Sequence, residues 1–310
     1  MMSRGLHYFV VLLGCLLLSA CSAVSYQQQR EVNQLVDAGY SQTRITLEDG
    51  GTLSYWQVGQ GEAKPTLLLV HGFGGDAQSS WQQVMLNLAH DYHIIAPDLA
   101  WFGQSYSHGE ANLATQTQLM QELLDHLAIT SVNLVGISYG GFVSFDLMVK
   151  DARVEKAVIL ASPAYLFSDA ELAKLSQRFA VESPEAIFVP QNKAEMRHLL
   201  AGTFDNFPWY PGFIDEQIYQ RYFAQWQPQK RRLIQTLPQH RDQIANDVEL
   251  SQLPETLLIW GENDKVFPLS AGLALADTIK APIVVIPDAP HGISNEYPEI
   301  VTRAIKEFIP

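Results

Sequence analysis

Short apolar runs alternate with stretches of helical periodicity along most of the chain. Apolar residues recur at helical spacing over residues 80–88, 115–127 and 142–149. The apolar runs have the length of buried strands and cover Thr66–Val70, His93–Ala96, Ser131–Val135, Val154–Ala161, Thr256–Trp260 and Pro282–Ile286. Short buried strands separated by helices indicate a mainly parallel sheet that is covered on both faces. The pattern therefore predicts an α/β fold.

Two further strands are expected at the start of the folded body. Arg44–Leu47 and Leu53–Val58 have the composition of strands, and Asp49, Gly50 and Gly51 lie between them. Aspartate followed by glycine is a strong hairpin signal, because glycine adopts the positive φ angles that tight turns need. We expect an antiparallel hairpin here.

Residues 163–253 interrupt the alternation, because they show helical patterns but no convincing strand. Many aromatic residues lie in this stretch, namely Phe204, Phe207, Trp209, Tyr210, Phe213, Tyr219, Tyr222, Phe223 and Trp226. We predict a helical cap between two parts of the core, residues 43–162 and 254–310. The cap is expected over the carboxyl edge of the sheet, where open α/β sheets bind ligands. Most of its aromatic residues should form the cap's own core, and some should face the cleft.

The first 20 residues have the pattern of a targeting segment. Arg4 precedes the apolar run Tyr8–Leu18, which is too short for a comfortable membrane span. The run ends in Leu18–Cys21, which resembles a bacterial lipobox. That resemblance implies cleavage before Cys21 and a lipid anchor on its sulfur. The alternative is a plain secretory signal cut nearby, as after Ala20 or Ala23.

The cysteines are consistent with export of the chain. Cys15 lies in the targeting segment and Cys21 at its end, and there is no other cysteine. The mature chain therefore has no internal disulfide, although an exported protein occupies an oxidising compartment. Residues 21–42 are predicted to be the lipidated cysteine and a spacer. Ser22, rather than aspartate, follows the cysteine, and by resemblance this implies the outer membrane of a Gram-negative cell envelope.

Composition narrows the class of partner. The chain has 310 residues, of which 47% are hydrophobic and 17% charged, with a formal net charge of −13. This is a globular composition with enough apolar residues for one sizeable core. An acidic chain argues against nucleic acid as a partner, because binding to phosphate backbones needs clustered lysine and arginine. It does not argue against a neutral lipid or ester.

One short motif carries candidate chemistry. Gly136, Ser138 and Gly140 form a Gly-x-Ser-x-Gly pattern between the run Ser131–Val135 and the helical stretch 142–149. A serine at the tip of such a tight turn needs neighbours without a Cβ, because strand and helix approach each other closely. The start of the following helix would then favour negative charge near the serine. This context makes Ser138 a candidate nucleophile.

A serine hydroxyl becomes a good nucleophile when a base takes its proton and a carboxylate orients that base. Asp264 follows the predicted strand Thr256–Trp260, and His291 follows Pro282–Ile286. Both loops should open at the same edge of the sheet as Ser138. Glu262 competes with Asp264 as the acid, and Asp264 fits the Gly-x-x-Asp pattern better.

Taken together, these motifs resemble the α/β-hydrolase fold, whose order along the chain is serine, acid and histidine. The resemblance covers residues 43–309 outside the cap. It implies an eight-stranded, mostly parallel sheet and an oxyanion hole made by the backbone N–H groups of Phe73 and Tyr139. Phe73 lies in a His-Gly-Phe-Gly-Gly segment that matches the oxyanion loop of the family. His71, Asp76 and Asp98 are expected to be structural. Ala100 and Trp101 replace a proline and a glycine of the family pattern, in a loop near the pocket.

The resemblance implies cleavage of a carboxylic ester, as in bacterial lipases and monoacylglycerol-lipase-like hydrolases. A serine in the elbow disfavours the epoxide hydrolases and haloalkane dehalogenases of the same fold, which attack with a carboxylate. A short-chain carboxylesterase, an amidase, a thioesterase and a non-catalytic binding homologue remain alternatives. No cofactor motif or metal-ligand cluster occurs in the sequence, so we expect neither cofactor nor metal. The expected partners are a small-molecule or lipid ester and, through Cys21, the membrane; the sequence specifies no oligomeric state.

Overall fold

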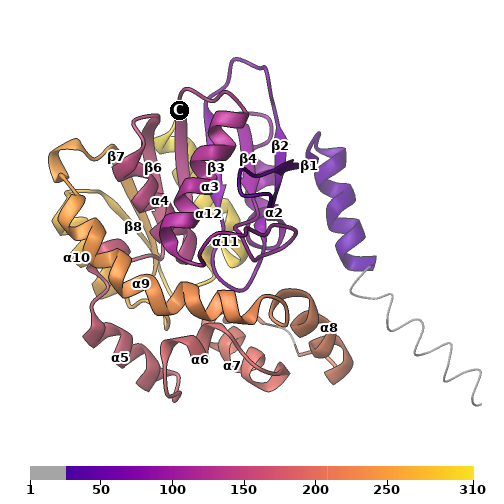
Figure 1. Cartoon of the computed structure of the whole chain (residues 1–310), viewed down its shortest axis with the longest axis vertical. Coiled ribbons are helices and arrows are strands. Elements are labelled where there is room, and N and C mark those ends of the chain that lie inside the picture. Colours follow the sequence, from indigo (N-terminus) through magenta and orange to yellow (C-terminus); the bar gives the residue numbers. More distant parts are fainter. Residues whose placement is uncertain (1–25, 208) are drawn as a thin grey trace, which may run out of the picture.

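A computed structural model describes residues 26–207 and 209–310 (Figure 1). Eight strands form one sheet in the order β1-β2-β4-β3-β5-β6-β7-β8. The strands are β1 Ser41–Thr46, β2 Thr52–Val58, β3 Thr66–Val70, β4 His93–Pro97, β5 Val132–Ile137, β6 Val154–Leu160, β7 Glu255–Gly261 and β8 Ile283–Ile286. β1, β2 and β4 pair in antiparallel fashion, and every other neighbouring pair is parallel. The predicted α/β fold with an eight-stranded, mostly parallel sheet is confirmed.

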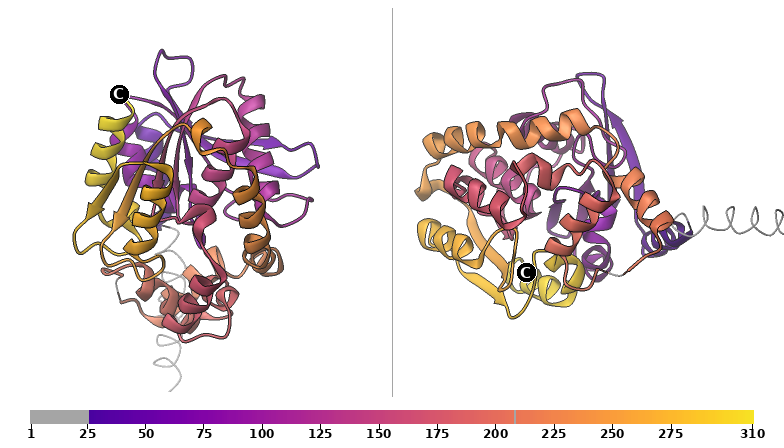
Figure 2. Two further views of the ribbon diagram at one scale, coloured as in Figure 1. Left: turned by 90° about the vertical axis from the view of Figure 1, so that its left-hand side faces the viewer. Right: turned by 90° about the horizontal axis from the view of Figure 1, so that it is seen from below.

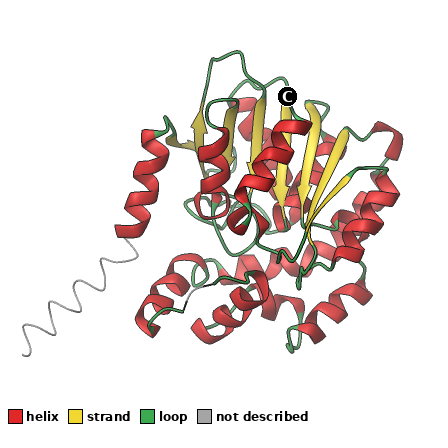
Figure 3. Ribbon diagram, turned by 180° about the vertical axis from the view of Figure 1, so that it is seen from behind, coloured by secondary structure: helices red, strands yellow, loops and turns green. Residues whose placement is uncertain are grey.

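Helices cover both faces of the sheet, which buries the apolar side chains on each face (Figures 1 and 3). One face is covered by α2 Ala77–Leu88, α11 Ile293–Glu296 and α12 Pro298–Phe308. The other face is covered by α3 Leu113–His126, α4 Tyr139–Lys150 and α10 Leu269–Ile279. Strands buried on both faces explain why the apolar runs were nearly continuous rather than alternating.

The first two strands form the expected hairpin. Ser41 pairs with Gln57 and Thr46 with Thr52, and Gly50 in the connecting turn has a φ of +83°. The Asp49 carboxylate accepts hydrogen bonds from the backbone N–H groups of Gly51, His108 and Gly109. The turn aspartate thus also fastens a neighbouring loop to the hairpin.

Polar caps determine where two of the predicted helices begin. Asp76 caps α2 through a reciprocal pair of hydrogen bonds with Ser79, and Asn112 caps α3 by accepting from Thr115 N. Both helices therefore begin two or three residues before the apolar periodicity does, because a capping side chain satisfies the first free N–H groups of a helix.

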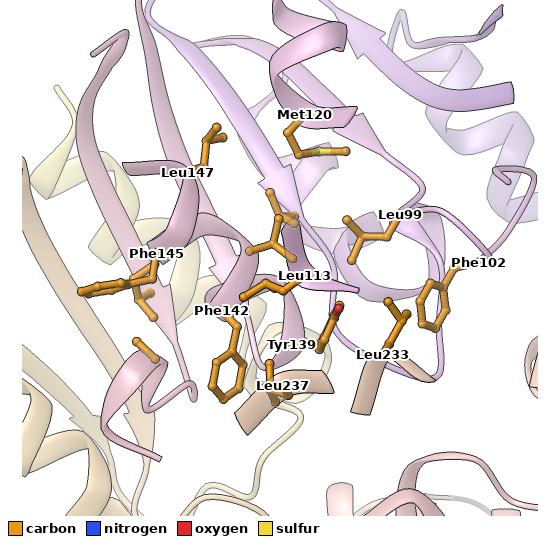
Figure 4. Packing of buried hydrophobic residues seen from close by; sticks show 14 of the residues in the cluster. Leu99, Phe102, Leu113, Met120, Tyr139, Phe142, Phe145, Leu147, Leu233 and Leu237 are labelled. Carbon is orange, nitrogen blue, oxygen red and sulfur yellow. The ribbon is translucent and has the colours of Figure 1, made fainter. Parts of the chain in front are cut away.

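The chain between β6 and β7 is helical and lies along the lower edge of the sheet in Figure 1 and in the left-hand view of Figure 2. Its helices are η1 Ala164–Leu166, α5 Asp169–Arg178, α6 Pro184–Phe188, α7 Lys193–Thr203, α8 Gly212–Tyr222, α9 Gln227–Asp247 and η2 Leu250–Gln252. Figure 4 shows Leu233 and Leu237 of α9 beside Tyr139 and Phe142 of α4, and all four belong to one buried cluster. The long helix α9 therefore joins this cap to the core.

The stretch predicted as a spacer includes a folded segment. Residues 26–37 are helical, and Leu35 is fully buried against the core. The Gln82 side-chain amide of α2 donates to the Glu31 carbonyl and to the Gln34 side chain. The predicted signal segment 1–20 and the lipidation site Cys21 lie outside the described residues. Within residues 26–207 and 209–310, no helix is long and apolar enough to cross a membrane.

Candidate active site

Ser138 lies in the sharp turn between β5 and α4. Its φ of +54° and ψ of −121° are unusual for a residue with a Cβ, and such backbone strain typically costs about 1–3 kcal/mol. The Ser138 N–H donates to the Leu160 carbonyl on β6 at 2.9 Å, which holds the turn in place. A Cβ at Gly140 would overlap the carbonyl oxygens of Val70 and His71. The glycine after the serine is therefore required by the close approach of α4 to the loop after β3.

The three candidate catalytic side chains form one hydrogen-bonded chain. His291 Nε2 lies 2.9 Å from Ser138 Oγ, and His291 Nδ1 lies 2.8 Å from Asp264 Oδ2. All three residues are buried. Ser138 follows β5, Asp264 follows β7 and His291 follows β8, so residues far apart in sequence meet because the parallel strands end at the same edge. His291 Nδ1 can carry a proton toward Asp264 while Nε2 faces the Ser138 hydroxyl.

Asp264 is oriented by backbone groups as well as by His291. Its Oδ1 accepts hydrogen bonds from the N–H groups of Val266 and Phe267, both at 2.8 Å. Glu262 is exposed and accepts instead from the backbone N–H of Asp288 at 3.1 Å. Of the two carboxylates considered from the sequence, Asp264 is the one that reaches His291.

Two backbone N–H groups are available near the serine. Tyr139 is the first residue of α4, so no carbonyl one turn earlier can accept from its N–H. Phe73 lies in the turn after β3, next to Gly72, where an added Cβ would lie 3.2 Å from the Ser138 Cβ. Among the described residues, neither N–H has a hydrogen-bond partner. The rings of Phe73 and Tyr139 pack edge to face at 5.5 Å, which fixes the two segments relative to each other.

Buried polar residues behind the site hold its loops. His71 Nε2 accepts from the Leu99 N–H at 2.9 Å, and burial lowers the pKa of His71 to about 4, so the ring is neutral. Asp98 accepts from the backbone N–H groups of Ala77 and Gln104. Burial raises the pKa of Asp98 to about 7, and the nearby Asp76 carboxylate adds to the rise. These contacts hold loops in place and leave no side-chain nitrogen of His71 free to act as a base.

A cavity of about 260 Å³ opens over Ser138 and His291, between the core and the cap. Its wall is formed by Phe73, Gly74, Gly75, Ser79, Ser80, Ser138, Phe188, Leu199, Leu200, Thr203, Phe204, Phe207, Tyr210, Ile218, Tyr222, Phe223, Val266, His291 and Asn295. Aromatic and aliphatic side chains dominate this set, and the described lining includes no lysine or arginine. Among the described residues, in the cavity and outside it, no cluster of three or more His, Cys, Asp or Glu side chains could hold a metal ion. The cavity suits an apolar, uncharged ligand group next to the serine.

Comparison with known proteins places the chain in a family. The sequence profile described as the Alpha/beta hydrolase family matches residues 67–304. The chain belongs to this family. It is 29% identical over 282 residues to the uncharacterized hydrolase YugF of Bacillus subtilis (strain 168), with 86% of this chain and 97% of that protein covered. It is 28% identical over 258 residues to a 2-hydroxymuconate semialdehyde hydrolase of Pseudomonas sp. (strain CF600), with 78% and 86% covered.

The crystal structure of a membrane phospholipase A, described as a bacterial virulence factor, has a similar fold. It superposes with a TM-score of 0.79 over 99% of this chain and 98% of that chain, at 24% sequence identity. At that identity the likeness concerns the fold alone. It covers the hydrolase core together with the helical cap.

Several residues of this hydrolase's cavity were not singled out from the sequence. Phe188, Leu199 and Leu200 come from short cap helices whose register cannot be read from periodicity alone. Ser79, Ser80 and Asn295 form a small polar part of the wall, and the Asn295 side-chain amide donates to the Ser79 carbonyl at 2.8 Å. Ser79 and Ser80 lie four and five residues after Gly75 of the oxyanion loop, and this proximity in the sequence was the available signal.

The aromatic residues of the cap face the cavity more often than expected, because the sequence predicted that most of them would form the cap's own core. Phe204, Phe207, Tyr210, Tyr222 and Phe223 line the cavity, whereas Trp209 and Phe213 face solvent.

The residue that replaces a family glycine lies away from the cavity wall. Trp101 is buried with a φ of +68°, the conformation that glycine adopts most easily. It is absent from the described cavity lining. The departure from the family pattern therefore alters the packing behind the site and leaves the wall of the cavity to other residues.

Proposed function

We propose that this hydrolase cleaves carboxylic esters with an apolar acyl chain, as a lipase or monoacylglycerol-lipase-like enzyme. Ser138 is the nucleophile, His291 the general base and acid, and Asp264 the carboxylate that orients the histidine. The observation that carries the proposal is the Ser138–His291–Asp264 hydrogen-bonded chain at the floor of an apolar cavity. Membership of the hydrolase family supports it further.

The first half of the reaction transfers the acyl group to the enzyme. His291 Nε2 takes the proton from Ser138 Oγ as the oxygen attacks the ester carbonyl carbon, and the carbonyl electron pair moves to its oxygen. The N–H groups of Phe73 and Tyr139 then donate to this oxyanion. One such donor is typically worth about 2.7–4 kcal/mol of transition-state stabilisation. When the carbonyl re-forms, the bond to the alcohol oxygen breaks, and His291 gives its proton to the leaving alcohol.

The second half returns the enzyme to its starting state. His291 takes a proton from water as the water oxygen attacks the acyl carbon on Ser138. The same two N–H groups hold the second oxyanion. Collapse of this intermediate releases the carboxylic acid, and Ser138 Oγ recovers its proton from His291. Asp264 stays ionised throughout and stabilises the protonated imidazole.

The cavity supports a single acyl chain as the group bound next to the serine. Its volume of about 260 Å³ lies just under the roughly 300–1,000 Å³ of most small-molecule pockets. The apolar wall suits a hydrocarbon chain, because burying each methylene contributes about 0.8 kcal/mol. The polar part formed by Ser79, Ser80 and Asn295 suits the hydroxyl groups of a small leaving alcohol.

Hydrolysis of a carbon–carbon bond is a second candidate, because a 2-hydroxymuconate semialdehyde hydrolase is among the relatives. The same serine and histidine could serve that reaction. The muconate part of such a substrate carries a carboxylate, which a buried site generally pairs with a cation. The absence of lysine and arginine from the described lining therefore favours the ester.

We also propose that the mature protein is held at the cell envelope by acyl chains on Cys21, in the outer membrane of a Gram-negative cell. The support is the sequence of residues 1–21, in which a positive residue and an apolar run end at a cysteine. Cys21→Ala should move the protein from the membrane fraction to the soluble fraction. Unchanged fractionation of the variant would contradict the anchor.

The test of the reaction is a chain-length series of p-nitrophenyl esters and a monoacylglycerol, measured beside Ser138→Ala. We expect a rate maximum at medium or long chains and a loss of about 10⁴–10⁶-fold in kcat in the variant. Circular dichroism should show that the variant stays folded. A maximum at acetate or butyrate would indicate a short-chain esterase.

Labelling with a fluorophosphonate probe separates the remaining alternatives. Labelling at Ser138 without ester turnover would indicate an amidase, a thioesterase or the carbon–carbon hydrolase, and turnover of 2-hydroxymuconate semialdehyde would identify the last of these. No labelling at all would favour a binding protein without catalysis.

A further inference from the structure

Two aromatic side chains of the cap are exposed to an unusual degree. Trp209 is 80% exposed and Phe213 is 50% exposed. Tryptophan is normally mostly buried, whereas single exposed apolar residues of other kinds are common. Whether this exposure serves a function depends on where Trp209 and Phe213 lie relative to the cavity.

The exposed pair lies in the sequence next to residues that line the cavity. Phe207 and Tyr210 line the cavity, and their rings lie 5.9 Å apart. Trp209 precedes Tyr210 directly, and Phe213 is the second residue of α8. One short segment therefore presents aromatic side chains both to the cavity and to the outside, so a lipid chain that enters here would pass from one set to the other.

The helical residues 26–37 lie along the same edge. Burial raises the pKa of Tyr210, and the Glu31 carboxylate adds to the rise; burial raises the pKa of Tyr222 to about 12, with a smaller contribution from Glu31. The Glu31 carbonyl accepts a hydrogen bond from the Gln82 side chain of α2, the helix that contributes Ser79 and Ser80 to the cavity wall. The right-hand view of Figure 2 shows this helix beside α8. Tyr26, which is 67% exposed, lies about 7.5 Å before Glu31 along the helix axis.

The chain thus enters the described fold next to the exposed aromatic residues. The sequence before this point holds the apolar run Tyr8–Leu18 and Cys21. Four residues lie between Cys21 and Tyr26, so these two residues can be at most about 18 Å apart. An anchor at Cys21 would therefore keep this edge of the cap close to the bilayer surface.

We infer that Tyr26, Trp209 and Phe213 form a bilayer-docking surface that holds the mouth of the cavity against membrane lipid. The inference rests on the proposed lipid-ester activity and on the proposed anchor at Cys21. Tyrosine and tryptophan favour the headgroup level of a bilayer, where the ring is apolar and one end is polar. With a net charge of −13, the chain gains nothing overall from anionic headgroups, so aromatic contact is the force available to it.

The first test compares two substrates in the purified full-length lipoprotein reconstituted into phosphatidylcholine vesicles. The double variant Trp209→Ser/Phe213→Ser should lose about tenfold or more on a long-chain monoacylglycerol dissolved in the vesicles. It should keep the wild-type rate on soluble p-nitrophenyl butyrate, because neither side chain lines the cavity. Leu273→Ser, on α10 at the far end of the molecule and 48% exposed, is the matched control and should change neither rate. Equal rates of wild type and double variant on the vesicle-borne ester would overturn the inference.

The second test does not depend on turnover, so it separates docking from the proposed reaction. Phe213→Cys and, in a separate protein, Leu273→Cys are labelled with an environment-sensitive fluorophore. The mature chain has no cysteine apart from Cys21, and the unsubstituted protein gives the background of labelling. With the same vesicles, the emission should shift to the blue at position 213 and stay unchanged at position 273. The same emission at position 213 with and without vesicles would overturn the docking surface, whatever the enzyme hydrolyses.

Discussion

Arg221 of the cap donates a hydrogen bond to Asp76 of the core, with Nη2 3.3 Å from Oδ2. Asp76 caps the start of α2, directly after the loop that carries Phe73. The Arg221 guanidinium also lies 4.9 Å from the ring of Tyr222, which lines the cavity. The ion pair therefore links cap helix α8 to the segment that supplies one of the proposed oxyanion donors.

Removal of this link should loosen the cap. Arg221→Met is expected to lower the free energy of unfolding by about 1–2 kcal/mol, because a mostly buried carboxylate loses its charged partner. It should also lower kcat/KM for long-chain esters more than for acetate, because only the long chain uses the cap side of the cavity. Urea unfolding and the ester series measure the two effects.

Lys280→Met is the control for the loss of a cation. Lys280 pairs with Asp277 at the surface, and both side chains are exposed. Such pairs contribute about 0–1 kcal/mol, so the change should be small in both assays. A loss for Arg221→Met no larger than that for Lys280→Met would contradict a structural role of the cap link.

The two candidate acids should differ sharply in their effect on the rate. Asp264→Asn keeps the shape of the side chain but no longer holds the correct tautomer of His291, and kcat should fall by about 10⁴-fold. The Glu262 side chain accepts a hydrogen bond from the Asp288 N–H rather than from His291, so Glu262→Gln should leave kcat within about twofold. Steady-state ester hydrolysis measures both. A larger loss in Glu262→Gln than in Asp264→Asn would exclude Asp264 as the orienting acid.

The sequence predicted Ser138, Asp264 and His291 together because each follows a recognisable strand. Parallel strands end at a common edge, so order along the chain and position after a strand were enough to bring the three side chains together in space. The strands themselves were visible because both faces are buried, which produces short continuous apolar runs. The sheet and the convergence of these residues thus follow from local patterns.

Contacts between the cap and the core could not be predicted in the same way. Arg221 and Asp76 are 145 residues apart in the sequence. The chain has many charged residues, and no local pattern shows which of them form an ion pair. The helix at residues 26–37, within the predicted spacer 21–42, was missed for a similar reason. Within residues 26–42, Leu35 is fully buried and Val32 and Ala38 pack partly buried against the core. So few apolar residues give no clear periodicity from which a packed helix could be recognised.

The length of the preferred acyl chain should follow the size of the cavity. Phe188 lines the cavity and packs 5.9 Å from Phe73, and Leu200 lines it from α7. Phe188→Ala should enlarge the cavity and move the rate maximum to longer esters, whereas Leu200→Phe should fill it and move the maximum to shorter ones. The p-nitrophenyl ester series measures both shifts. Two variants that keep the wild-type maximum would show that the acyl chain binds elsewhere.

Lys230 of α9 should make the stability of the protein depend on pH in the alkaline range. The side chain is 4% exposed, and its Nζ donates to the Tyr222 carbonyl at 2.9 Å and lies 4.9 Å from the centre of the Phe102 ring. Burial lowers the pKa of Lys230 to about 8, whereas an unfolded lysine titrates near 10.4. Burial of the charged form is therefore a cost that the folded state carries below pH 8.

The sign of the effect follows from the protons bound in each state. Between about pH 8 and pH 10 the unfolded chain keeps the lysine proton and the folded chain loses it, so the free energy of unfolding rises with pH. Relative to Lys230→Met, the wild-type protein should gain roughly 2 kcal/mol over this range, and the difference should be constant below pH 7. Urea unfolding of both proteins at several pH values measures it. A wild-type-minus-variant difference that stays flat from pH 8 to pH 10 would show that Lys230 keeps its charge in the folded cap, and that the contact with Tyr222 is an ordinary charged hydrogen bond.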